Sequence, residues 1–289
     1  MSGARAVLER IAVAAVSWPP SSRVLGRLSD VRLPSLLLVP LIHAYSRGYG
    51  VDLSEAAQPP SAYPSFNAFF TRQLRDGLRP VDPAAGVVVS PSDSRLSAIG
   101  PVPADLQLEQ VKGESYSLAA LLGSAPDAAC FASGVYATLY LSPAMYHRVH
   151  SPVDGDVVAW RYVPGRLYPV NAMGARAVPG LLARNERVVV RLQTAAHGVV
   201  AVVLVGATNV GRISLAFADL VTNRGHAAGE TRPASKVLLR RGDELGVFNL
   251  GSTVVLLVEA PRLEPATRSG ALVRVGEALW RPGAGSNLA

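Results

Sequence analysis

Short runs rich in Val, Leu, Ile and Tyr dominate the second half of the sequence and constrain the fold more than any other feature. They occupy 134–142, 156–163, 187–194, 198–207, 211–218 and 252–259, with Gly, Pro or Asp near many of their ends. Such runs predict β-strands bounded by turns. Because they show no regular βαβ alternation, a parallel sheet is not expected. The sequence therefore predicts an α+β protein whose body is a mainly antiparallel β-barrel or sandwich.

The N-terminal region, 1–60, differs from this body. Apolar residues at helical spacing predict an amphipathic helix at about 4–16. The apolar run at 33–45 is broken by Pro34 and Pro40, and it is shorter than the roughly 20 residues that cross a bilayer. Arginines also outnumber acids here, so we predict helices that lie on an anionic membrane surface without spanning it. The alternative is two ordinary helices that pack on the core.

The remaining chain, 61–289, is expected to be the catalytic β-rich domain. It opens with a predicted helix at 66–77, where three phenylalanines and Leu74 share one face and Gly77 closes the pattern. The single cysteine, Cys130, excludes a disulfide within the chain, and we expect it to be buried. No CxxC or HxxxH pair is present, so no metal site is expected.

Three kinds of reactive side chain stand in short motifs. The pattern Ser-Pro-x-Asp occurs twice, ending at Asp93 and Asp154, and each acid is either a turn residue or a positioned carboxylate. The stretch MYHRVH places His147 and His150 three residues apart. Histidine is the side chain best suited to move protons near neutral pH. Ser252 adds a hydroxyl that a nearby base can make nucleophilic.

The pair Gly251-Ser252 interrupts two apolar runs that both read as buried strands. Taken alone, a Gly-Ser pair in such a pattern indicates a turn or a β-bulge. Combined with a histidine and an acid, it completes the parts of a nucleophile activated by an oriented base.

Five segments follow, in order, the landmarks of the bacterial phosphatidylserine decarboxylases, and the sequence resembles that family. The segments are FNAFFTRQLRDGLRPVD (66–82), VKGESYSLAALLG (111–123), YHRVHSP (146–152), VGATNVGRI (205–213) and GVFNLGSTVVLL (246–257). The combination of LGST with YHRVH is the most specific part of the resemblance.

The resemblance implies a proenzyme that cuts itself between Gly251 and Ser252. The products would be a β chain, 1–251, and an α chain, 252–289, which form a heterodimer. Ser252 would become a covalent pyruvoyl cofactor, with no metal. Its carbonyl would form a Schiff base with the amine of phosphatidylserine, and loss of carbon dioxide would give phosphatidylethanolamine.

Residue roles also follow from the resemblance. Asp93, His150 and Ser252 match the self-cleavage triad, in which His150 is the base and Asp93 orients it. His147 matches the histidine linked to decarboxylation. Asp154 is then a turn residue.

One departure from the family pattern stands next to the histidine motif. Met145 replaces the acid that relatives commonly have, which leaves the hydrogen bonding around His147 open.

The expected partners follow from the same resemblance. They are phosphatidylserine in the membrane and the second chain of the same precursor, and whether two heterodimers pair is left open. The net charge of +7 accompanies no RNA-type aromatic motif and no lysine-rich tail, so no nucleic acid is expected. The expected location is peripheral, on the cytoplasmic face of a bacterial inner membrane.

Two other classes compete with this reading. Paired Ser-Pro-x-Asp turns on a β body also resemble lipoyl or biotinyl carrier modules, but neither Lys112 nor Lys236 has the Met-Lys context of such a carrier. A conventional serine hydrolase would use Ser252, His150 and Asp93, but no G-x-S-x-G elbow is present.

Overall fold

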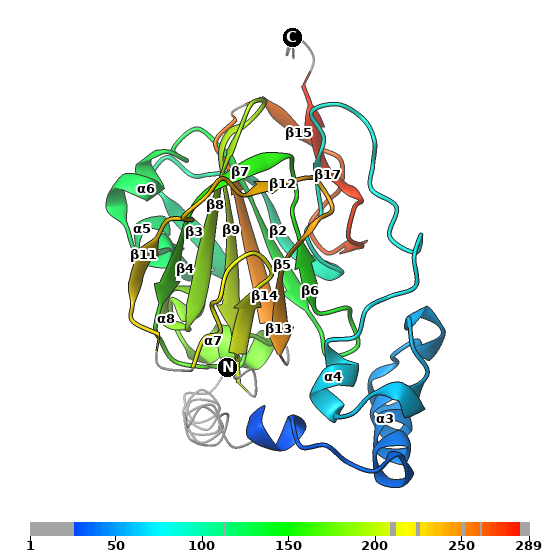
Figure 1. Ribbon diagram of the computed structural model, residues 1–289. Helices are drawn as coiled ribbons and strands as arrows, with labels where there is room; N and C mark the ends of the chain where they lie inside the picture. Colours follow the sequence, from blue (N-terminus) through cyan, green and yellow to red (C-terminus); the bar gives the residue numbers. More distant parts are fainter. Residues whose placement is uncertain are drawn as a thin grey trace.

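The computed structural model describes most of the chain (Figure 1). The described residues are 26–111, 114–208, 212–223, 226–249, 252–260 and 262–283, with only the backbone described for Val111 and Ser252. The predicted helix at 4–16 lies outside these residues and stays a prediction.

A large sheet forms the centre of the molecule (Figure 1). Its strands are β2 (Ser94–Pro101), β5 (Val135–Leu141), β7 (Gly155–Val163), β8 (Arg187–Thr194), β9 (Gly198–Gly206), β11 (Gly229–Thr231), β12 (Leu238–Leu239), β14 (Ser252–Val258) and β16 (Leu272–Val273). Within the described residues the order is β11-β7-β8-β9-β14-β5-β2-β16, and β12 also pairs with β7. Every pairing is antiparallel, as predicted. The barrel alternative is wrong, because β11 and β16 stand at opposite ends of an open sheet.

Two smaller sheets cover one face of the large sheet. One has the order β1 (Val88–Val89), β17 (Ala278–Pro282), β15 (Leu263–Pro265), and the other β10 (Arg212–Leu215), β13 (Glu244–Asn249), β6 (Arg148–His150). Their buried side chains, such as Phe248 and Trp280, join a common core with Val254 and Leu256 of β14. This half of the molecule is therefore a β-sandwich.

Short helices cover the opposite face. They are α5 (Leu118–Leu122), α6 (Ala125–Ala129), α7 (Ala172–Ala177) and α8 (Leu181–Arg184), and they lie beside the hairpin of β3 (Gln107–Val111) and β4 (Glu114–Ser117). Leu121 and Leu181 pack against Val255 and Leu257 of β14 in a second core. Since both faces are covered, the central strands read as continuous apolar runs rather than alternating ones.

The predicted strands agree closely with the observed ones, with one exception. Within the described residues, the run at 211–218 forms only the four-residue strand β10. The chain then turns, and the Leu215 N–H donates a hydrogen bond to the Leu220 carbonyl at 3.2 Å. The strand propensity of this run is thus overridden by a tight turn.

An N-terminal helical region occupies one corner of the molecule (Figure 1, lower right). It contains α3 (Ser35–Tyr49), the 3-10 turns η1 (Leu53–Glu55) and η2 (Pro60–Ala62), and α4 (Phe66–Phe70). The predicted break at Pro40 is wrong, because α3 runs through it. Pro40 is exposed, so water can satisfy the backbone carbonyl that loses its helical partner. No helix in the described part of the chain has the length and apolarity needed to cross a membrane.

The helix predicted at 66–77 is also shorter than expected. Helix α4 ends at its C-cap, Thr71. Beyond it, Leu74 forms a β-bridge with Ala56, flanked by two backbone hydrogen bonds of 2.9 Å between the same segments. Pairing with a distant segment thus replaces continuation of the helix, which local spacing alone could not reveal.

Cys130 is exposed, so its predicted burial is wrong. It is the C-cap residue of α6, and its thiol donates a hydrogen bond to the Pro126 carbonyl at 3.6 Å.

Candidate functional site

The backbone of Ser252 lies at the head of the central strand. Residue 252 is the first of β14, paired with Leu141 on one side and Gly206 on the other. The preceding strand, β13, ends at Asn249 in a different sheet, so the chain changes sheets between these two positions. Asn249 is held by hydrogen bonds with Asn67, at 3.0 Å, and with the Arg212 carbonyl, at 3.3 Å. The predicted cleavage site therefore follows an anchored strand end and precedes a strand that is paired along its whole length on both sides.

His147 lies beside this strand end. Its carbonyl accepts a hydrogen bond from the Phe248 N–H at 3.0 Å. The ring is 0% exposed and stacks on Phe70 with ring centroids 4.0 Å apart. Among the described residues, neither ring nitrogen makes a well-formed hydrogen bond, and the nearby Met145 backbone favours the protonated ring. Burial and the nearby Arg72 lower the pKa of His147 to about 3, so the imidazole is neutral at physiological pH.

His150 sits at the end of β6 with both ring nitrogens bonded. Nδ1 lies 2.7 Å from the Gly242 carbonyl, and Nε2 lies 3.2 Å from the Tyr146 hydroxyl. Its backbone N–H donates to the Pro91 carbonyl at 2.8 Å. Burial lowers the pKa of His150, so this imidazole is also neutral at physiological pH.

Asp93 lies close by, with partners other than His150. The Arg79 guanidinium donates to both carboxylate oxygens, with the shortest contact at 2.6 Å, and the Val275 N–H donates at 2.9 Å. Arg79 also pairs with Glu55 of η1 at 2.7 Å. Asp93 favours protonation of His150 through space, but within the described residues no hydrogen bond joins the two side chains.

The second Ser-Pro-x-Asp element has a different setting. Asp154 is exposed in the turn before β7 and accepts a hydrogen bond from the Arg241 N–H at 2.8 Å. Met145 turns its sulfur toward the Ser142 N–H, at 3.3 Å, within the loop that carries His147. The two copies of the motif thus place one buried and one exposed carboxylate.

A polar cavity of about 640 Å³ opens onto this cluster. Tyr146, His150, Gly242 and Glu244 form one side. The segment from Gln73 to Val81, which includes Arg79, forms much of the rest. His150 therefore has access to solvent from the side of the small sheets, whereas His147 does not line this cavity.

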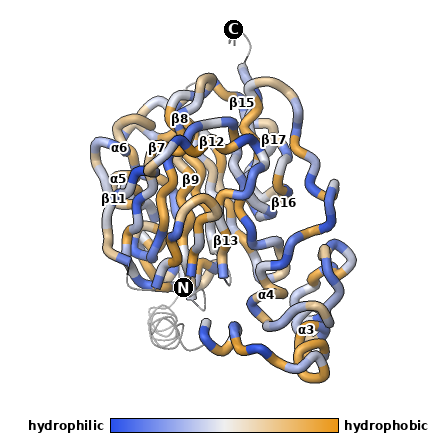
Figure 2. The backbone as a smooth tube through the Cα atoms, viewed as in Figure 1, coloured by the Kyte–Doolittle hydropathy of each residue, from blue (hydrophilic) through white to orange (hydrophobic). Residues whose placement is uncertain are grey.

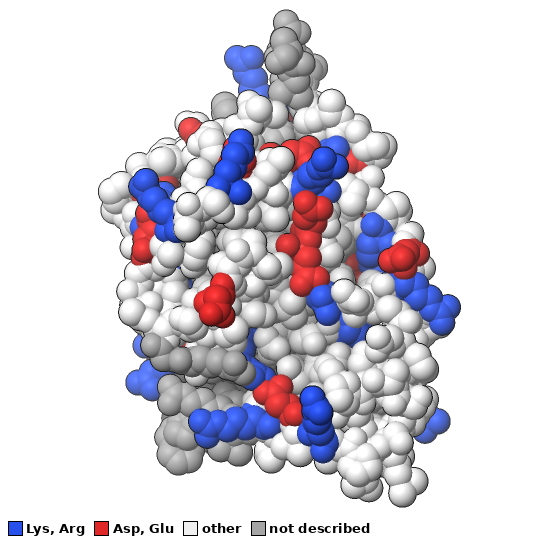
Figure 3. Space-filling view, viewed as in Figure 1, with Lys and Arg blue, Asp and Glu red and all other residues white. Residues whose placement is uncertain are grey.

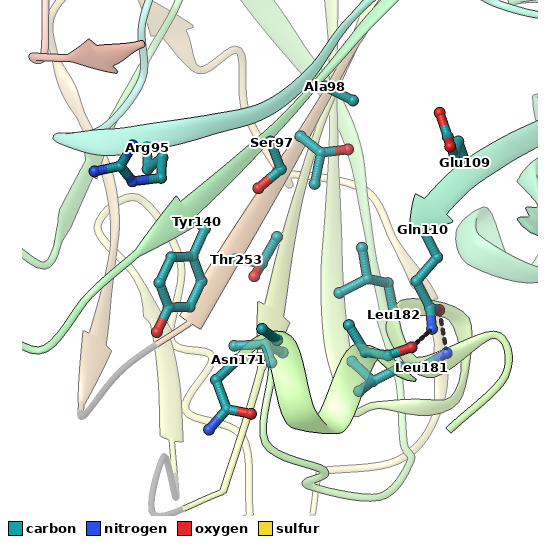
Figure 4. A pocket seen from close by; sticks show the side chains of 14 residues that line it. Arg95, Ser97, Ala98, Glu109, Gln110, Tyr140, Asn171, Leu181, Leu182 and Thr253 are labelled. Atoms are coloured by element: carbon teal, nitrogen blue, oxygen red, sulfur yellow. Dashed lines mark hydrogen bonds between the residues drawn. The ribbon is translucent and has the colours of Figure 1, made fainter. Parts of the chain in front are cut away.

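A second cavity of about 520 Å³ lies on the helical side of the sheet, between β2, β5 and α7 (Figure 4). Thr253 and Tyr140 lie at its strand side, and Leu181 and Leu182 give it an apolar wall. Gln110 is held across it by a hydrogen bond from the Leu181 N–H at 2.6 Å. Thr253, the residue after Ser252, is the part of β14 that lines this cavity.

Several residues at this site were missed by sequence reasoning. Tyr146 stood inside the histidine motif, and its spacing from His150 was a usable signal. Gly242, Arg79 and Phe70 come from distant segments, and only the tertiary fold brings them to the histidines. No group of three or more His, Cys, Asp or Glu that could hold a metal ion occurs in the described part of the chain.

Comparison with known proteins agrees with the predicted resemblance. The family model for phosphatidylserine decarboxylase matches residues 66–281, a range that contains every predicted site residue. A phosphatidylserine decarboxylase proenzyme of Anaeromyxobacter sp. (strain K) is 45% identical over 279 residues, covering 94% of this chain and 98% of the relative. One of Acidovorax ebreus (strain TPSY) is 48% identical over 260 residues, covering 88% and 90%. The chain belongs to the phosphatidylserine decarboxylase family.

Proposed function

We propose that the chain matures by self-cleavage between Gly251 and Ser252 and then decarboxylates phosphatidylserine to phosphatidylethanolamine. The observation that carries this function is the family match, which spans Asp93, both motif histidines and Ser252. The curated relatives are named proenzymes, which supports maturation by cleavage.

In the proposed self-cleavage, Ser252 Oγ attacks the Gly251 carbonyl carbon while His150 Nε2 accepts the hydroxyl proton. The acyl group passes from nitrogen to oxygen and forms an ester. Loss of the Cα proton of residue 252 then expels the Gly251 carboxylate and leaves dehydroalanine. Tautomerisation and hydrolysis release ammonia and leave a pyruvoyl group at the head of 252–289. Gly251 suits this attack because it has no side chain to block the carbonyl.

The fold explains how the two fragments would stay together after the cut. Strand β14 pairs along its whole length with β5 and β9, which both belong to 1–251. Strands β16 and β17 pair with β2 and β1 of the same fragment. Cleavage would break one peptide bond while leaving these ladders intact, so an α–β heterodimer is proposed. Whether two heterodimers pair stays a prediction, which a molar mass from light scattering would test.

The pyruvoyl group would supply an electron-withdrawing carbonyl for the loss of carbon dioxide. The residues present fit such a group. His147 is a neutral, buried imidazole whose ring nitrogens make no well-formed hydrogen bond among the described residues, and it lies beside the strand that leads to residue 252. We assign it to hold or deliver a proton during decarboxylation.

The α3 face, defined as Leu36, Leu37 and Leu41, supports docking on a membrane. These side chains are 83%, 60% and 46% exposed, although α3 buries Leu38 and Ile42 on its other side. Figure 2 shows this helix as a largely apolar element, and Figure 3 shows few charges over that corner. An exposed apolar face of this kind marks an interaction site.

The chemistry of the substrate favours a lipid surface as the partner of the α3 face. Phosphatidylserine keeps its acyl chains in a bilayer, so the enzyme must reach the head group there. Arg27, Arg32 and Arg47 are exposed in the same N-terminal part of the chain and would contribute about 1 kcal/mol each if they lie close to anionic lipids. The cytoplasmic face of a bacterial inner membrane remains the proposed location, to be tested by fractionation.

Intact-mass analysis of the purified chain tests the proposal most directly. We expect two fragments, 1–251 and 252–289, the second blocked to Edman degradation and reactive with phenylhydrazine. Ser252→Ala should remain one chain and release no carbon dioxide from phosphatidylserine vesicles. A single unmodified chain with decarboxylase activity would contradict the proposal. The two alternative functions, a serine hydrolase and a carrier module, both predict a single chain.

A further inference from the structure

Two fixed groups hold the His150 ring, and neither is the carboxylate that the family resemblance assigns to that task. The Gly242 carbonyl lies 2.7 Å from Nδ1, and the Tyr146 hydroxyl lies 3.2 Å from Nε2. The two carboxylate oxygens of Asp93 accept hydrogen bonds from the Arg79 guanidinium and from the Val275 N–H instead.

These contacts determine the tautomer of His150. A carbonyl oxygen can only accept a hydrogen bond, so Nδ1 must carry the proton. In a neutral imidazole the other nitrogen then presents its lone pair. Nε2 can therefore only accept from Tyr146, whose hydroxyl is the donor.

The backbone makes this arrangement rigid. His150 is anchored to the Pro91 carbonyl, and the Gly242 N–H donates to the Ser151 carbonyl at 2.9 Å. Gly242 has φ of +93°, a conformation that favours glycine, and a Cβ there would lie 2.6 Å from Val81. The orienting carbonyl is thus presented by a turn whose geometry requires a residue without a side chain.

Tyr146 is suited to be the donor because it stays protonated. Burial is the main cause that raises its pKa to about 12. It is only 7% exposed, and its ring lies 5.6 Å from the His150 ring at an angle of 30°. The phenol is therefore neutral and oriented at any pH at which the protein would work.

Other charged groups also face His150. Glu244 and Asp93 favour its protonation, whereas Arg148 disfavours it. Arg79 and the exposed Arg75 and Asp76 line the same cavity. Glu244 is paired with Arg148 at 2.6 Å and Asp93 with Arg79 at 2.6 Å, so each acid has a cation beside it.

Resting on the function proposed above, we propose that Tyr146 is a positioning residue for His150. Its hydroxyl donates to Nε2 and stabilises the neutral ring, while the Gly242 carbonyl orients that ring through Nδ1. His150 is thereby kept as a neutral base, and the Ser252 hydroxyl must displace the Tyr146 hydroxyl from Nε2 before its proton passes to that nitrogen. In this arrangement Asp93 acts through Arg79 and through the charge it presents, rather than by a direct hydrogen bond to the base.

Histidine ¹⁵N NMR on the full chain tests this proposal without depending on cleavage. The Ser252→Ala chain, labelled at histidine, should show the Nδ1–H tautomer for His150. In the same background, Tyr146→Phe removes one donor to the neutral ring and should raise the measured pKa of His150 by about half to one unit. Tyr116→Phe is the matched control, because it also removes a buried tyrosine hydroxyl but lies on the helical side of the sheet, in a different core from His150.

An Nε2–H tautomer in the parent chain, or an unchanged pKa in a folded Tyr146→Phe chain, would overturn the proposal. If Tyr146→Phe fails to fold, fluorotyrosine at position 146 keeps the shape and is a stronger donor. It should lower the pKa of His150, and no change there would overturn the proposal equally.

Cleavage kinetics give a second readout that a purely structural role would not move. In cell-free synthesis, Tyr146→Phe should shift the pH profile of cleavage upward and slow cleavage about three- to tenfold below the pKa of His150. Its rate at high pH should not fall. A uniform loss at every pH would indicate a structural role and overturn the assignment, whereas absence of cleavage in the unsubstituted chain would contradict the proposed function instead.

Discussion

Strand β14 and helix α3 are both rich in Leu and Val, yet the fold treats them in opposite ways. Val254 to Val258 are each 0% exposed, since neighbouring strands pair with both edges of β14 and cores cover both faces. Helix α3 is covered on one side only, and Leu36 remains 83% exposed on the other. Similar apolar composition therefore has two outcomes here, a strand that is fully buried in the core and a helix that leaves one apolar face exposed.

The two regions meet at the site. Phe70 of α4 stacks on His147, and Glu55 of η1 pairs with Arg79, which holds Asp93. The helical region from α3 to α4 therefore does more than carry the α3 face, because Phe70 and Glu55 also contact the proposed site residues or their partners. We call these contacts, Phe70 with His147 and Glu55 with Arg79, the junction between the helical region and the sheets. Substitutions on its two sides can separate effects on chemistry from effects on the α3 face.

The largest effect is expected at His150, which belongs to the sheet side of the junction. His150→Ala should slow self-cleavage by about 10²- to 10⁴-fold, because the base is lost. Asp93→Asn should also stall processing. His147→Ala, on the Phe70 side, should still be cut but yield an inactive enzyme. Gel analysis of precursor and fragments checks this, with Asp154→Asn as the control.

The opposite pattern would reverse the assignment of the two histidines. Accumulation of uncut His147→Ala together with normal maturation of His150→Ala would show that the buried imidazole is the base.

The contrast in burial predicts the next largest effect. Leu256→Ala should reduce the free energy of unfolding by about 2–5 kcal/mol, because it leaves a cavity in a closed core. Leu36→Ala should change it by less than about 0.5 kcal/mol. Urea unfolding of both in the Ser252→Ala background makes the comparison. Similar losses for the two leucines would mean that α3 is covered in solution.

Replacement of Leu36, Leu37 and Leu41 by Ser tests the α3 face as a membrane contact. Binding to vesicles that contain anionic lipid should weaken roughly 10- to 100-fold, since apolar area is lost from the contact. Cleavage and thermal stability should be unchanged. Vesicle flotation measures binding.

The matched control for the α3 face replaces Leu238 and Leu272, which are 58% and 64% exposed on β12 and β16. If both sets of substitutions weaken flotation equally, the α3 face is not the contact. Deletion of 1–45 is a poorer test, because it would also remove Leu38 and Ile42 from the cluster that covers Phe69.

The last prediction concerns stability at acid pH, and its effect is small near neutral pH. The pKa of His147 is lowered from 6.5 to about 3 in the folded chain. Between these pH values the unfolded chain therefore binds a proton at this residue that the folded chain does not. Stability from this residue is complete above about pH 6.5 and falls as the pH drops toward 3, by up to about 1.4 kcal/mol per pH unit. His147→Gln should flatten this slope in urea titrations of the Ser252→Ala chain. A slope for His147→Gln equal to that of the parent chain would show that His147 is not buried in solution.

Local pattern was sufficient for the strands but not for the helices. Strands such as β8 and β9 were predicted within a residue because a long apolar run between turn residues has few alternatives. Helix α4 was overestimated because Leu74 pairs with Ala56, a contact between segments that spacing cannot show. A break was predicted at Pro40, but α3 continues through it. The sequence could not show that Pro40 is exposed, where water can replace the lost helical hydrogen bond.

The site shows the same division. The motif order located the two histidines, Asp93 and the Gly251–Ser252 pair, and the family match spans all of them. The partners of His150 could not be predicted, since Gly242 is distant in sequence and carries no side chain that could signal a role.

The sequence by itself determined the antiparallel β body and the reactive groups, which are a serine after a glycine at the head of a strand and two histidines in one motif. These features depend on residues close together in the chain, so short-range patterns record them. Only the tertiary structure decided that the large sheet is open, that His147 is sealed against Phe70, and that His150 is held by Gly242 and Tyr146 while Asp93 binds Arg79. These outcomes depend on contacts between distant segments, and each is set by which groups lose access to water when the two regions pack together.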